Sequence, residues 1–273
     1  MQEFSSDTEQ LVCNLDDRVF TITLNRPEAR NALSDELTRA LRRALTWAAT
    51  SADVGAIVMT GAGKAFCAGG DVKRMASRNA SAVDAPGAQA AFLEMSARHH
   101  ETAGALRLMR KPSIAALPGA AAGAGLALAL ACDLRIASDT AFVSTGYARV
   151  GLSGDYGVAW LLTRTVGPAQ ARQLMLTAER VAADRAEQIG LFNRIVPEAD
   201  LRTEAQAWAR QLANGPAIAL GYIKDSLDEA LSIDHASAIN NEADRLLKSR
   251  STNDHREAAR AFVEKRDPQF TGT

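Results

Sequence analysis

Cysteine, histidine and net charge are all scarce in this 273-residue chain. None of its three cysteines forms a CxxC pair, which excludes a disulfide framework and fits a reducing compartment. Its four histidines do not occur at the spacing of metal ligands, so we expect no bound metal. The formal net charge of −1 provides no overall attraction for nucleic acid or for an anionic membrane. An acidic ligand would have to be bound by local arginine and lysine side chains.

Segments that enter or cross a membrane are also missing. The apolar run 120–132 is well short of the roughly 20 residues that span a bilayer, and we predict that it forms a buried helix. The first residues lack the basic region and the apolar stretch of a secretory signal. We therefore expect a cytoplasmic protein that does not bind membranes.

The composition is that of a globular protein, with 47% hydrophobic and 23% charged residues. A predicted hairpin of residues 10–15 and 19–24 precedes an amphipathic helix capped by Ser34, and an apolar strand follows at 56–60. Strand, helix and strand in this order imply a parallel pairing. The chain is therefore predicted to have an α/β fold.

The second half of the chain changes from mixed to mainly helical. Residues 113–117, 134–137 and 141–143 are predicted strands, whereas helical patterns dominate from residue 159. We place a boundary near Asp200, with a core domain over residues 1–200 and a helical region over residues 201–273. Residues 76–90 are rich in Ala, Ser and Gly and are predicted to form a mobile surface segment of the kind that covers a pocket.

Two glycine-rich segments, residues 66–71 and 118–125, each follow a strand-like apolar run and carry few reactive side chains. Small residues allow a ligand to approach the main chain, so these segments offer backbone N–H groups. Two convergent N–H groups can stabilise a developing oxyanion. The pair predicts a site that binds an anion formed during a reaction.

The glycines at 61–63 and 151–154 do not form any of three common functional motifs. Gly61-Ala62-Gly63-Lys64 lacks the spacing of a phosphate-binding loop, and Phe66 stands where a dinucleotide fingerprint has its third glycine. In residues 151–155, Asp155 replaces the last glycine of a nucleophile elbow. Nucleotide-dependent and serine-hydrolase chemistry are therefore not expected.

Four motifs resemble those of the crotonase superfamily, also called the enoyl-CoA hydratase/isomerase family, and the resemblance covers nearly the whole chain. They are LNRPEARNAL at 24–33, AFCAGGDV at 65–72, the segment 118–133, and AFVEKR at 261–266. The resemblance implies a spiral of ββα units over residues 1–200, with residues 201–273 as a C-terminal helical oligomerisation region. It also implies a homotrimer or a dimer of trimers.

The same resemblance implies an acyl-CoA substrate, with no cofactor beyond the coenzyme A moiety of that substrate. The thioester carbonyl would lie between the N–H groups of Gly70 and Ala124, where a helix N-terminus also favours negative charge. The implied coenzyme A contacts come from three parts of the chain: Arg26, Ala29 and Arg30; Ala68, Gly69, Asp71 and Val72; and Lys265, which reaches a neighbouring subunit's ligand.

The chain departs from the hydratases of this family at their two glutamate positions, which correspond to Ala127 and Tyr147. Neither side chain can serve as an ionised carboxylate, so the proton transfers of ordinary hydration lack their groups. Asp155 stands where some isomerases and the 4-chlorobenzoyl-CoA dehalogenases of the family carry an essential carboxylate. One carboxylate is enough to move a proton from C2 to C4 of a 3-enoyl-CoA. The expected activity is therefore isomerisation.

Alternative functions remain open at this point. Counting back from Lys111-Pro112, His100 falls where the dehalogenases carry a water-activating histidine, and Tyr147 occupies the position of their tryptophan. Asp155 and His100 would then act in an aryl-CoA dehalogenase-like reaction or in thioester hydrolysis. An enoyl-CoA hydratase and a non-catalytic acyl-CoA binder are further alternatives.

Overall fold

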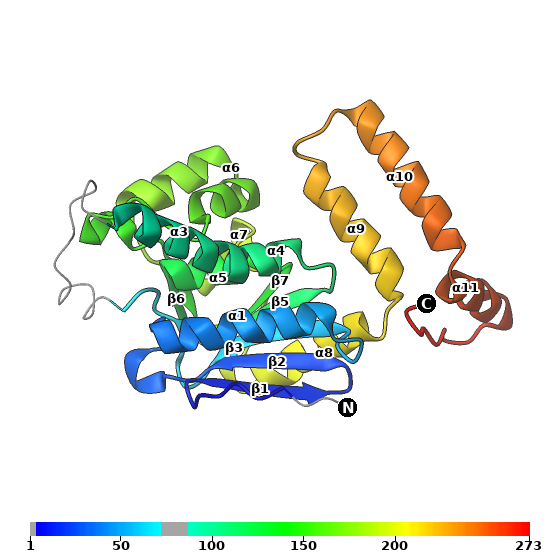
Figure 1. The fold of residues 1–273 in the computed structure, drawn as a ribbon, viewed down its shortest axis with the longest axis horizontal. Coiled ribbons are helices and arrows are strands. Elements are labelled where there is room, and N and C mark those ends of the chain that lie inside the picture. Colours follow the sequence, from blue (N-terminus) through cyan, green and yellow to red (C-terminus); the bar gives the residue numbers. More distant parts are fainter. Residues whose placement is uncertain (1–3, 72–86) are drawn as a thin grey trace.

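Two β-sheets form the centre of the computed structural model, in which residues 4–71 and 87–273 are described (Figure 1). The larger sheet has the strand order β1-β2-β3-β5-β7-β10. Its strands are Leu11–Asp16, Val19–Leu24, Ala56–Gly61, Ser113–Leu117, Leu134–Ser138 and Arg194–Val196. β1 and β2 pair antiparallel, as the predicted hairpin requires, and the other neighbours pair in parallel. The predicted α/β fold is confirmed.

A smaller sheet carries both glycine-rich segments. Its order is β4-β6-β8-β9, formed by Ala65–Cys67, Ala120–Ala122, Phe142–Ser144 and Val181–Ala182. The prediction that 120–132 is wholly helical is wrong at its start, because residues 120–122 pair with β4 and the helix α5 covers Ala124–Ala131. A strand of three alanines has no alternating pattern by which the sequence could reveal it.

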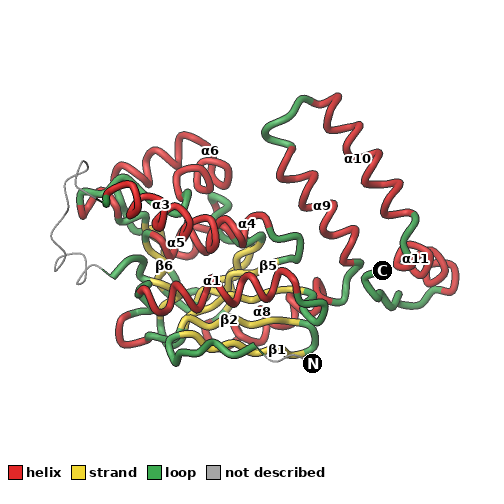
Figure 2. The backbone as a smooth tube through the Cα atoms, in the orientation of Figure 1, coloured by secondary structure: helices red, strands yellow, loops and turns green. Residues whose placement is uncertain are grey.

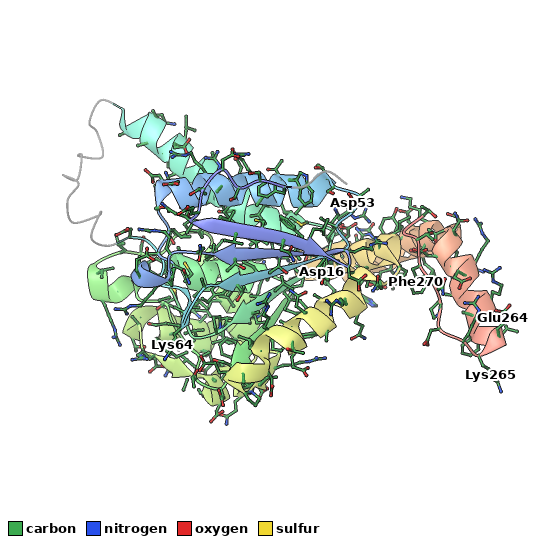
Figure 3. All side chains as sticks on the ribbon, turned by 90° about the horizontal axis from the view of Figure 1, so that it is seen from below. Asp16, Asp53, Lys64, Glu264, Lys265 and Phe270 are labelled. Carbon is green, nitrogen blue, oxygen red and sulfur yellow. The ribbon has the colours of Figure 1, made fainter. Side chains whose placement is uncertain are left out.

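Helices cover both faces of the larger sheet. α1 (Asp35–Thr50) begins at the predicted cap, where Ser34 Oγ accepts the N–H of Leu37 at 3.0 Å. α1 lies on one face, and α8 (Leu201–Ala213) lies on the opposite face (Figure 3). α8 buries Leu201, Ala205, Ala209 and Ala213 against the sheet, so the first helix of the predicted C-terminal region belongs structurally to the core.

The segment predicted as one helix near 90–110 contains an irregular turn. α3 (Ala88–His99) continues into a π-helical turn at His100–Gly104 and then into α4 (Ala105–Leu108). α6 (Val158–Thr177) bends at Gly167, and α7 (Ala183–Gln188) follows it.

Val72 and residues 76–86 of the predicted surface segment lie outside the described residues.

α9 (Ala217–Glu229), α10 (His235–Arg250) and α11 (Asn253–Glu264) extend away from the rest of the molecule as a helical arm (Figure 2). Three ion pairs hold α9 to the core: Lys224–Asp133 at 2.6 Å, Arg110–Asp225 at 3.2 Å, and Arg107–Asp228. Neither the arm nor any other helix in the described ranges is long and apolar enough to cross a membrane.

Asn31 connects the β2–α1 turn to the turn before the first glycine-rich segment. Its fully buried side chain donates from Nδ2 to the carbonyls of Ala62 at 2.9 Å and Ala65 at 2.8 Å. Its Oδ1 accepts the N–H of Arg26 at 2.8 Å. Its φ of +58° is a conformation that asparagine tolerates better than most residues.

We predict that Asn31→Ala lowers the free energy of unfolding by about 2–4 kcal/mol, because it strands buried polar groups and places alanine at positive φ. Urea-induced unfolding of the two proteins measures this difference. Asn31→Gly removes the same hydrogen bonds without the strain on Cβ, and it should recover only a minor part of the loss. An alanine variant as stable as the parent would contradict this role.

Candidate active site

The two glycine-rich segments approach each other so closely that only glycine fits at two positions. A Cβ on Gly69, whose φ is +90°, would lie 2.7 Å from the carbonyl oxygen of Ala122 and 3.3 Å from the nitrogen of Ala124. A Cβ on Gly125 would lie 2.2 Å from the carbonyl oxygen of Cys67. The missing side chains therefore allow the backbone of β4 to meet the start of α5.

Cys67 forms hydrogen bonds beside this contact. Its thiol is fully buried and donates to the carbonyl of Asn31 at 3.1 Å, while its sulfur accepts the N–H of Gly69 at 3.4 Å. Burial raises the pKa of this thiol to about 12, so the sulfur stays protonated. Cys67 is thus a packing residue and has no nucleophilic character.

Gly70 and Ala124 line one pocket of about 160 Å³, which we name the cradle pocket. Ala124 is the first residue of α5, so its N–H has no partner within the helix. The pocket brings these two residues together with Asp155, as the proposed chemistry requires. Its other lining residues are Leu33, Asp35, Thr38, Asp71, Met95, Arg98, His99 and Tyr156.

Tyr147 holds Asp155 by a hydrogen bond. The tyrosine begins a short 3-10 turn (Tyr147–Val150) and is buried, and its hydroxyl donates to Oδ1 of Asp155 at 2.5 Å. Burial, together with the charge of Asp155, raises the pKa of Tyr147 above its ordinary value. The phenol therefore remains protonated and stays a donor to the carboxylate.

The other two carboxylates of the cradle pocket each face an arginine. Arg26 lies 3.5 Å from Asp71, and Arg98 lies 3.5 Å from Asp35. Asp155 differs from both, because the hydrogen-bond partner that it has among the described residues is the neutral hydroxyl of Tyr147.

His99, and not the predicted His100, lies beside Asp155. The half-buried His99 ring contacts Tyr156 with centroids 4.1 Å apart, and burial lowers the pKa of its imidazole despite the nearby Asp155 charge. His100 is exposed and lines a neighbouring pocket. Successive residues of a helix point about 100° apart, so His100 does not share the pocket that His99 lines with Asp155.

Most predicted coenzyme A contacts gather around the β2–α1 turn. The N–H of Ala68 donates to the carbonyl of Arg30 at 2.9 Å, and that of Leu33 donates to the carbonyl of Gly69 at 2.8 Å, which joins the turn to the first glycine-rich segment. Ala29 is half-buried in this turn. Arg30 is exposed, with a φ of +50°.

Three further predicted contacts are Arg26, Asp71 and Lys265. Arg26 pairs with Asp71 and donates to the carbonyl of Ala32 at 2.6 Å, so these two side chains have partners within the protein. Lys265 follows α11 at the far end of the arm, away from the sheets of its own chain (Figure 3).

In the described part of the chain, no group of three or more His, Cys, Asp or Glu side chains could hold a metal ion.

Comparison with known proteins matches the family model "Enoyl-CoA hydratase/isomerase" over residues 15–273. The chain is 38% identical to the "probable enoyl-CoA hydratase echA8" of Mycobacterium bovis, covering 96% of this chain and 98% of that protein. It is 36% identical to the 1,2-epoxyphenylacetyl-CoA isomerase of Escherichia coli K12, covering 97% and 99%.

A solved enoyl-CoA hydratase from Polaromonas sp. JS666 has the same fold, with a TM-score of 0.87 and 35% identity over 95% of this chain and 99% of that one. A second, from Bacillus anthracis, has a TM-score of 0.89 and 28% identity over 97% and 100%. The spiral fold that the motifs implied is therefore confirmed. The chain belongs to the enoyl-CoA hydratase/isomerase family, the crotonase superfamily.

Proposed function

We propose that this acyl-CoA enzyme moves a double bond, converting a 3-enoyl-CoA into a 2-enoyl-CoA, with Asp155 as the proton carrier. One observation carries the proposal: Asp155 shares the cradle pocket with Gly70 and Ala124. The position of the first hydratase glutamate holds Ala127, which is fully buried in α5. The position of the second holds Tyr147, whose hydroxyl is bonded to Asp155.

The proposed reaction begins when the thioester oxygen accepts hydrogen bonds from the N–H groups of Gly70 and Ala124. Asp155 removes a proton from C2, and the electrons of the C2–H bond move toward the thioester oxygen to form a dienolate. Each N–H donor contributes on the order of 3 kcal/mol to this anion. Asp155 then returns the proton at C4, and the double bond lies between C2 and C3. The scheme uses no cofactor beyond the substrate's coenzyme A moiety.

Tyr147 has a positioning role in this scheme. Its hydroxyl fixes one carboxylate oxygen of Asp155 and leaves the other for the substrate. The bond is charge-assisted while Asp155 is ionised. Tyr147 thus holds the carboxylate in one orientation.

A second candidate function is hydrolysis, and the position of His99 favours it. A neutral imidazole beside Asp155 could activate water, either on the thioester or on an ester formed with the aspartate. In this candidate, His99 takes the role that the sequence suggested for His100.

We expect Asp155→Asn to lower kcat on a 3-enoyl-CoA by at least about 100-fold, because it removes the proton carrier. Formation of the conjugated 2-enoyl-CoA, followed by ultraviolet absorbance, measures the rate. Asp184→Asn, on the surface of α7, is the matched control and should leave kcat unchanged. Full turnover by the Asp155 variant would refute the assignment, and a rapid-quench adduct on Asp155 of the parent would favour the second candidate.

Tyr147→Phe should reduce kcat by about 10- to 100-fold, since it deletes a hydrogen bond to a charged group worth about 1.5–3 kcal/mol. Tyr147 contacts Asp155 by this hydrogen bond, so the loss should fall on kcat and leave KM nearly unchanged. The same absorbance assay over a range of substrate concentrations separates the two constants. An unchanged kcat would contradict the positioning role of Tyr147.

The proposed assembly is a homotrimer, or a dimer of trimers, built through the helical arm. The arm exposes large apolar side chains on all three helices: Ile223, Leu227, Ile239, Leu246, Leu247, Phe262 and Val263. Leaving these in water is unfavourable, and a second copy of the chain would bury them. In such an assembly Lys265 can reach the ligand of a neighbouring subunit.

Light scattering coupled to size exclusion should give three or six times the 29.0 kDa chain mass. The double substitution Leu246→Ser and Leu247→Ser removes apolar contact area from α10, so it should shift the mass toward one chain. A monomeric parent protein would exclude the assembly. Unfolding of the variant with a normal urea midpoint would show that its loss of assembly is not a folding defect.

A further inference from the structure

A second pocket adjoins the cradle pocket, and we name it the outer pocket. It has a volume of about 470 Å³ and lies between α3, the π-helical turn and the start of α6. His99 and Tyr156 line both pockets, so the two meet at this ring pair. The other lining residues of the outer pocket are Ser96, His100, Ala103, Gly104, Arg107, Leu108, Gly157, Trp160 and Leu161.

The cradle pocket is the smaller of the two, at about 160 Å³, and it holds Gly70, Ala124 and Asp155. A thioester in the cradle pocket places its acyl group near the His99–Tyr156 pair. The outer pocket is the space that adjoins the His99–Tyr156 pair on the other side.

The lining of the outer pocket is partly aromatic. Trp160, Tyr156 and His99 present aromatic surface, and Leu108, Leu161 and Ala103 add aliphatic surface. Aromatic rings favour edge-to-face and offset contacts beyond the effect of area alone. A flexible saturated chain gains no such contacts and loses more rotamer freedom when bound.

The arginines around the outer pocket have partners within the protein, so the pocket favours an uncharged group. Arg107 lines the pocket, but its guanidinium forms an ion pair with Asp228, so it is not poised for an acidic acyl group. Arg107 and Arg164 lie over the Trp160 ring, 5.4 and 3.6 Å from its centroid. These two guanidinium groups hold the indole in place.

We propose that the outer pocket binds a planar aromatic ring at the far end of the acyl group, and that Trp160 is the residue that selects it. This inference rests on the proposed function, since it assumes a thioester in the cradle pocket. Ring contacts of this kind correspond to about 2- to 10-fold in affinity. The favoured substrates are therefore aryl-acyl thioesters of coenzyme A.

Binding of unreactive analogues tests the inference without turnover. Two coenzyme A derivatives, with a methylene group in place of the thioester sulfur, carry the same acyl chain ending in phenyl or in cyclohexyl. Isothermal titration of the full chain should show that the phenyl analogue binds at least about 3-fold more tightly. A merely apolar pocket would give the opposite order, because cyclohexyl is the more hydrophobic group.

Substitutions at Trp160 test the selecting residue. Trp160→Leu should abolish the phenyl preference, and Trp160→Phe should retain it. Leu176→Ala is the control, since Leu176 is exposed on the same helix and lines neither pocket. Unchanged affinity for coenzyme A itself shows that the Trp160→Leu variant is folded.

Equal or tighter binding of the cyclohexyl analogue overturns the inference, as does a phenyl preference that survives in Trp160→Leu. If these results occur while the parent isomerises a straight-chain 3-enoyl-CoA, the proposed function stands and only the aryl preference fails. If neither analogue binds, both the inference and the acyl-CoA site fail.

Discussion

The close contact between two backbone segments is the constraint on which the site depends. Gly69 and Gly125 have no side chain because a carbonyl of the opposite segment occupies that space. The parallel pairing of β4 with β6 brings the segments together, and Asn31 fixes the turn that precedes the first of them. The cradle pocket is thus formed by main chain, and its shape follows from the fold itself.

The reacting groups lie on elements that are separate from this contact. Asp155 precedes α6, Tyr147 belongs to a short turn after β8, and His99 ends α3. Each can change without removing a glycine that the close approach requires. Within one fold, therefore, the backbone defines the anion that can be stabilised, and side chains on neighbouring elements decide the route of the proton.

Local patterns were sufficient to predict the main elements. Ser34 and the apolar repeat of α1 predicted that helix, and the β1–β2 hairpin followed from alternation. β4 and β6 escaped prediction because three-residue strands of small residues carry no period. Asp155, Gly70 and Ala124 could be placed in one site only through the family resemblance, since Asp155 lies 85 positions after Gly70. His99 was missed because two adjacent histidines are equivalent in the sequence, and only the structure shows which of them faces Asp155.

The use of main-chain donors has a consequence for how such a site can be found by mutagenesis. Gly70→Ala would leave its N–H in place, and position 124 is already alanine. A scan that truncates side chains one at a time would therefore pass over both groups that bind the anion and would report only their surroundings. Only a change of the backbone itself, such as an ester in place of an amide, removes one donor and leaves every side chain intact.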